Sequence, residues 1–131
     1  MMHKPFCSRF FLLLCLLMNT ACGPAIIAGG AAVGVGSAAF IYGELQTEER
    51  VSFDAAWNAT QKAVEELGFT TTSKENGEFW GELIARNAEA KKVRIKLRSP
   101  DETRTEIRLR VGFFGDEESS KRILDEIRRR Y

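Results

Sequence analysis

Histidine and cysteine are scarce in this sequence, and the few that it has lie near its amino terminus. The 131 residues include one histidine, His3, and three cysteines, Cys7, Cys15 and Cys22. Beyond Cys22 the sequence therefore offers no imidazole base, no thiol nucleophile and no histidine or cysteine to hold a metal. No serine lies in a nucleophile-elbow sequence, and no pair of carboxylates stands out as an acid–base pair. We expect a protein that is not an enzyme, has no catalytic residues and binds no metal or cofactor.

Charged side chains are absent from residues 10–42. Lys4 and Arg9 precede this stretch, and Glu44 is the first charged residue after it. A short basic start, an apolar run over residues 10–18 and small or polar residues after it are typical of a secretory signal peptide. Removal of this signal would leave 17 of the 19 basic residues against 18 acidic ones. That net charge of −1 argues against a nucleic-acid partner.

Residues 20–22, which read TAC, resemble the end of the lipobox of bacterial lipoproteins. The resemblance implies that residues 1–21 are a cleaved signal peptide, and that membrane lipid is a partner through acylated Cys22. Asn19 departs from the pattern, because an aliphatic residue is usual there. By the sorting rule of enterobacterial lipoproteins, Gly23 implies the outer membrane, with the domain facing the periplasm. The alternative is an uncleaved transmembrane helix, for which the uncharged stretch is long enough.

Residues 22–41 join this cysteine to the charged part of the chain and are rich in glycine and alanine. Gly30 and Gly34 have the spacing at which small residues let two membrane helices approach closely. One interpretation is a glycine-zipper helix that packs against another membrane helix. The other is an apolar tether, since glycine-rich chains behave as coils.

Residues 42–131 have the dense charge and periodic apolar pattern of a folded domain. Residues 43–51 are expected to form a strand. A helix follows, with Ser52 or Asp54 as its N-cap and Gly68 at its carboxy-terminal end. Its apolar residues recur at helical spacing: Phe53, Ala56, Trp57, Ala63, Val64 and Leu67.

The rest of the domain predicts four strands and a second helix. Residues 69–85 are expected to form a hairpin with a type I′ turn at Asn76-Gly77. Two strands follow, on either side of a turn at residues 99–103, and a last helix begins after Asp116. Apolar residues alternate with charged ones in these two strands, which indicates an antiparallel sheet with one dry face and one wet face: Val93, Ile95, Leu97, Ile107, Leu109 and Val111.

The predicted order of elements is β-α-β-β-β-β-α. We therefore expect an α+β, two-layer fold, in which an antiparallel sheet carries both helices on its apolar face. Three short motifs resemble a family of small bacterial lipoproteins that is known only as a domain of unknown function: residues 54–57, residues 67–69 and residues 112–116. The resemblance covers nearly the whole mature chain and implies this fold and location, but no activity.

The wet face of the sheet is the candidate binding surface. Five basic residues should project from two neighbouring strands on this face: Arg94, Lys96, Arg98, Arg108 and Arg110. Such a face can bind phosphate groups of lipids or an acidic protein. Cross-strand pairs with Glu82 and Glu106 would instead make it an ordinary solvated face. Phe79 and Trp80 are adjacent, so one is expected in the core and the other exposed.

These features together predict a membrane-anchored lipoprotein that is a structural or binding accessory of the bacterial cell envelope. Its partner would be an envelope protein or an anionic lipid. Two alternatives stay open: a lipid or anion carrier or sensor that uses the basic sheet face, and a membrane oligomer built on Gly30 and Gly34.

Overall fold

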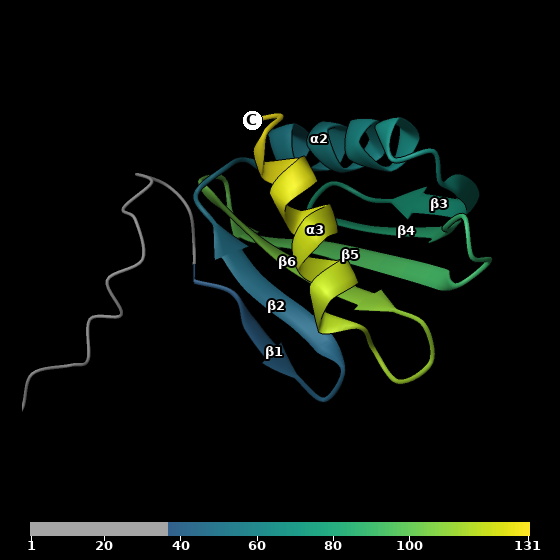
Figure 1. The fold of residues 1–131 in the computed structure, drawn as a ribbon. Coiled ribbons are helices and arrows are strands. Elements are labelled where there is room, and N and C mark those ends of the chain that lie inside the picture. Colours follow the sequence, from purple (N-terminus) through teal and green to yellow (C-terminus); the bar gives the residue numbers. More distant parts are fainter. Residues whose placement is uncertain (1–36) are drawn as a thin grey trace, which may run out of the picture. The chain divides into compact units, whose positions relative to one another are not determined.

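Apolar and polar residues alternate along most strands of residues 37–131, the part of the chain that this computed structural model describes (Figure 1). In these residues the strands build an antiparallel sheet, and two helices pack against it, which is the predicted α+β class. The predicted signal peptide, the lipid site at Cys22 and the glycine pair of Gly30 and Gly34 lie outside the described residues.

The strands are ordered β1-β2-β6-β5-β4-β3 across the sheet, and neighbouring strands are antiparallel. The bounds of the elements are, in chain order, β1 Ala39–Ile41, β2 Glu44–Glu49, α2 Phe53–Glu66, β3 Thr70–Asn76, β4 Trp80–Arg86, β5 Lys92–Asp101, β6 Arg104–Val111 and α3 Glu117–Arg128. Strands β3 to β6 form a meander, and β2 pairs with β6 at its far side. Figure 1 shows α2 and α3 on the same side of this sheet.

The two helices begin and end where local chemistry predicts. The hydroxyl oxygen of Ser52 accepts a hydrogen bond from the backbone N–H of Ala55, so Ser52 rather than Asp54 caps α2. Gly68, just beyond that helix, has φ +72°, a conformation that side chains rarely adopt. A carboxylate oxygen of Asp116 accepts from the backbone N–H of Ser119 at 2.9 Å and caps α3.

The core lies between the helices and one face of the sheet. Helix α2 contacts β3 to β6, and α3 contacts β2, β6 and α2. Alternate residues of the strands point into this layer, among them Leu45, Leu83, Ile95, Leu97, Ile107 and Leu109. The ring of Trp57 lies over Gly81, where an added Cβ would come within 2.6 Å of it. A glycine therefore stands at the second position of β4 because a helix tryptophan occupies the space of its side chain.

An ion pair lies inside the domain, where the end of α3 meets β2. Arg128 approaches Glu49 Oε1 with Nη2 at 2.6 Å and with Nε at 3.0 Å. The Thr47 hydroxyl donates to the same oxygen at 2.8 Å, and Glu49 is fully buried. Burial and the nearby Glu49 carboxylate raise the pKa of the Tyr131 phenol. This pair joins two parts of the chain that the sequence analysis left unconnected.

The first strand of the sheet was not predicted. β1 pairs with β2, although its residues lie in the segment expected to be a tether. Tyr42 and Gly43 connect the two strands with φ of 51° and 78°, as a type I′ turn requires. The composition before β1, rich in glycine and alanine, indicated a tether or a membrane helix, so this strand of three residues was not predicted.

The prediction of a type I′ turn at Asn76-Gly77 was wrong. The hairpin of β3 and β4 is present, but neither Asn76 nor Gly77 has a positive φ. Residues 77–79 form the connection, and the Gly77 N–H donates to the Trp80 carbonyl at 2.8 Å. The indole of Trp80 fills the place of a side chain at position 77. Gly77 is therefore explained by a ring packed against the backbone rather than by its φ.

Candidate functional site

The five predicted basic residues lie together on the face of β5 and β6 that points away from the core, which we call the basic sheet face. Register places Arg94 opposite Arg110 and Lys96 opposite Arg108. Arg98, at the end of this array, lies opposite Glu106. The prediction that these side chains share one surface is therefore confirmed by the pairing of the strands.

Acidic neighbours neutralise the basic sheet face only in part. Arg94 Nε lies 3.3 Å from Glu82 Oε1 without reaching hydrogen-bond geometry, and Arg108 Nη2 lies 3.5 Å from Glu106 Oε2. Arg110 donates instead to the backbone carbonyl of Tyr42. Within the described residues, Lys96 and Arg98 make no ion pair. Exposed pairs of this kind contribute about 0.2–1 kcal/mol each, and like charges directly opposite each other are destabilising.

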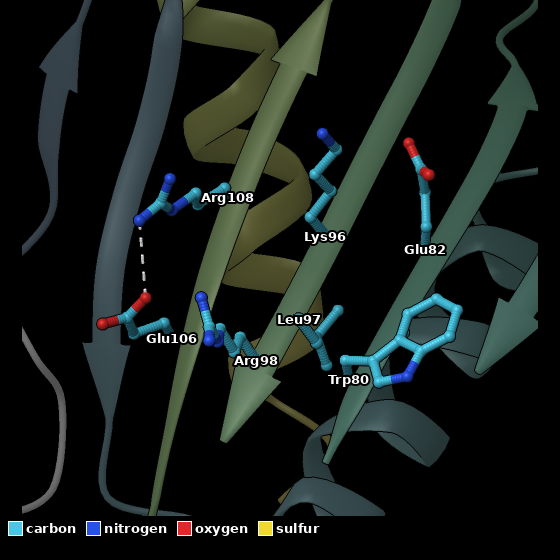
Figure 2. A pocket seen from close by; sticks show the side chains of 8 residues that line it. Trp80, Glu82, Lys96, Leu97, Arg98, Glu106 and Arg108 are labelled. Carbon is cyan, nitrogen blue, oxygen red and sulfur yellow. Dashed lines mark ion pairs between the residues drawn. The ribbon is translucent and has the colours of Figure 1, made fainter. Parts of the chain in front are cut away.

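A shallow hollow of about 450 Å³ lies on this face, across β4, β5 and β6. Figure 2 shows two rows of side chains that cross the three strands, one with Glu82, Lys96 and Arg108, the other with Trp80, Arg98 and Glu106. The hollow has the volume of a small-molecule site but is open to solvent. Its three cations and its indole can receive a phosphate or carboxylate group beside an apolar surface.

Phe79 and Trp80 are both exposed, with 46% and 50% of their surface open to solvent. The prediction that one of them enters the core was wrong, because Phe79 belongs to the loop before β4 and does not follow the alternation of the strand. Trp80 lies opposite Arg98 in the sheet, so its indole belongs to the basic sheet face. This is one of the two placements that the predicted alternation of Phe79 and Trp80 allowed.

The described residues contain no group of three or more histidine, cysteine or acidic side chains able to hold a metal. The carboxyl groups whose pKa values are lowered accept hydrogen bonds in a turn and at a helix N-cap. Hydrogen bonds from Thr103 and Arg104 lower the pKa of Asp101 to about 2, and the hydrogen bond from Ser119 lowers that of Asp116. Among the helices of residues 37–131, none is long and apolar enough to cross a membrane.

A second hollow, of about 560 Å³, lies at the end of the sheet where β5 begins and β6 ends. The residues that line it are Lys91, Lys92, Arg94, Arg110, Gly112 and Phe113. This group of residues was not predicted, although two sequence signals mark it. One is the lysine doublet before β5, and the other is the phenylalanine doublet between Gly112 and Gly115.

Similarity to known proteins identifies a family for the whole chain without assigning a role to the basic sheet face. No curated protein matches the chain. The expected membership of an uncharacterised family is confirmed, since a family model spans nearly all of the sequence. The chain belongs to the family described as protein of unknown function (DUF3568), whose model matches residues 6–130.

Proposed function

We propose that this protein is a membrane-anchored lipoprotein of the bacterial cell envelope, and that its α+β domain is a non-enzymatic binding accessory. Lipid on Cys22 would hold the domain at the outer membrane, facing the periplasm. The basic sheet face would bind an anionic group of an envelope lipid or protein. The lipobox-like residues 20–22 support the anchor, and the geometry of the sheet supports the binding surface.

The observation that carries the binding role is the placement of two like-charged pairs side by side. Arg94 faces Arg110, and Lys96 faces Arg108, on adjacent positions of the same two strands. A sheet face that only needs to be soluble gains nothing from this arrangement, because directly opposed cations destabilise the pairing. An anion bound over the hollow would offset the repulsion between Lys96 and Arg108, which both line it. The fold thus keeps a surface whose charges are complementary to a partner outside it.

Titration with inorganic pyrophosphate tests this role, because Trp80 lines the hollow and can report binding by its fluorescence. We expect a saturable change in the full-length protein that is lost in the double variant Lys96→Glu, Arg98→Glu. The matched control is Lys62→Glu, Arg122→Glu, which reverses two exposed charges on the helices. Equal responses in both double variants, or no response in the unaltered protein, would contradict the proposal.

A carrier or sensor function would use the same hollow. It differs from an accessory role in one measurable property, the release of a lipid ligand to a second membrane. Transfer of a fluorescent phosphatidylglycerol between two vesicle populations would favour the carrier, and pyrophosphate binding without such transfer would favour the accessory.

A further inference from the structure

Three aromatic side chains project from one end of the domain into solvent. Tyr42, Phe113 and Phe114 are 94%, 84% and 86% exposed, whereas the other large apolar side chains exposed within residues 37–131 reach about half or less. Tyr42 lies in the β1–β2 turn, and the two phenylalanines lie in the loop between β6 and α3. Figure 1 shows this turn and this loop at the same end of the sheet. We call the three residues the aromatic tip.

The aromatic tip is held in place by its backbone and not by burial of its rings. Arg110 Nη2 donates to the Tyr42 carbonyl at 2.7 Å, which ties the turn to the end of β6. Gly43 and Gly115 pack so closely that a Cβ on either would collide with the opposite loop. The fold therefore fixes the position of these rings while using none of them in its core.

Basic side chains flank the aromatic tip. The second hollow, which Phe113 lines, is bordered by Lys91, Lys92, Arg94 and Arg110, and no acidic side chain lines it in the described part of the chain. Lys91 pairs with Glu89 at 2.7 Å, whereas Lys92 makes no ion pair among residues 37–131. The pKa of Lys91 is raised by Glu89 and, to a smaller extent, by Asp116, the N-cap of α3, whose carboxylate also accepts a hydrogen bond from the Ser119 N–H.

We propose that the aromatic tip docks on the surface of an anionic phospholipid bilayer. Aromatic rings favour the zone between lipid headgroups and acyl chains, and neighbouring lysines and arginines are attracted to lipid phosphates. A second copy of the domain is a poorer partner for a tip flanked by cations, because two such ends repel each other. Two projecting loops can contact the flat surface of a bilayer, whereas a peptide requires a concave site rather than a projecting tip.

The length of chain before the domain also favours a bilayer as the partner of the aromatic tip. The 16 residues 23–38 separate Cys22 from Ala39, a distance of at most about 60 Å when the chain is fully extended. β1 adds only three residues before Tyr42. A domain tethered at Cys22 would thus always have its aromatic tip within reach of the bilayer. This step rests on the proposed anchor, whereas the exposure and charge of the aromatic tip do not.

Tryptophan quenching by brominated lipid tests the docking. The full-length protein is reconstituted into vesicles of phosphatidylglycerol and phosphatidylethanolamine that contain dibromostearoyl phosphatidylcholine. Phe113→Trp adds a reporter in the aromatic tip, and Phe79→Trp adds a matched one in the exposed loop before β4, at the opposite end of the sheet and roughly 20 Å away. Each reporter is measured as the change relative to the unaltered protein, because Trp57 and Trp80 emit in every sample. Both rings are exposed, so neither replacement removes core packing.

We expect the reporter at position 113 to show roughly twice the quenching of the reporter at position 79. The excess should fall when phosphatidylglycerol is left out, or when Lys91→Glu and Lys92→Glu are added. Equal quenching at the two positions would overturn the docking. A blue shift at position 113 without quenching would also overturn it, since that result means a protein partner.

Intact mass, measured on the same preparation, keeps the two proposals apart. An acylated protein whose position 113 is not quenched contradicts the docking alone. An unacylated chain with strong quenching at position 113 contradicts the lipid anchor and supports the aromatic tip.

Discussion

The two faces of the sheet differ in how their charged side chains are paired. On the covered face, Glu49 is fully enclosed, and its Oε1 is bound by Arg128 and by the Thr47 hydroxyl, whereas its Oε2 has no hydrogen-bond partner among the described residues. On the basic sheet face, two cations face two other cations, and Lys96 has no ion pair among the described residues. The charge inside the fold is placed with its partner, while the basic sheet face carries cations in excess of the acidic side chains beside it. The difference separates residues that stabilise the domain from residues that we propose for binding.

The largest expected effect is on the covered face. Arg128→Ala leaves the Glu49 carboxylate buried without its cation, and such a loss costs about 3–5 kcal/mol of unfolding free energy. Arg129→Ala is the matched control, because the neighbouring arginine is exposed and pairs with Glu126 at the surface. Its effect should stay within about 1 kcal/mol. Urea unfolding followed by circular dichroism measures both, and similar losses for the two variants would remove the contrast between the faces.

Asp101, the last residue of β5, carries a charged carboxylate that accepts hydrogen bonds from residues close to it in sequence. Hydrogen bonds from Thr103 and Arg104 lower its pKa from 3.8 to about 2, so its ionised form is favoured in the folded protein. This contribution is present above pH 3.8 and is lost as the pH falls toward 2. Asp101→Asn should therefore be less stable than the unaltered protein at neutral pH, and the difference should vanish near pH 2. A difference that is the same at both pH values would show that the charge contributes nothing.

The smallest expected effect is on the basic sheet face, and it has the opposite sign. Arg108→Glu removes the exposed 3.5 Å pair with Glu106 but places an acid opposite Lys96, and Arg94, Arg98 and Arg110 lie nearby. We expect a gain of about 0.2–1 kcal/mol in unfolding free energy, which salt should reduce. The same variant should lose pyrophosphate binding. Lower stability at low salt would mean that the arginine serves the sheet rather than a ligand.

Local patterns predicted most of the fold. The caps at Ser52 and Asp116, the end of α2 at Gly68 and the alternation along β5 and β6 depend on residues close together in sequence. The same alternation placed the five basic residues on one face. These features could be predicted because each follows from a short-range rule of helix or strand geometry.

The features that were missed depend on contacts between distant residues. The pair of Glu49 and Arg128 joins the second strand to the last helix, and no local pattern distinguishes it from the surrounding surface charges. β1 is too short for a periodic signal and exists because β2 offers it an edge. The aromatic tip forms only when the β1–β2 turn meets the β6–α3 loop through Gly43 and Gly115.

The anchor at Cys22 is the central claim of this account, and intact mass spectrometry of the membrane-extracted protein tests it most directly. We expect a chain that starts at Cys22 and carries acyl chains, and we expect this species to be lost in Cys22→Ala. An unmodified chain that begins at Met1 would contradict the claim, and the uncharged residues before β1 would then be the candidate membrane-spanning anchor.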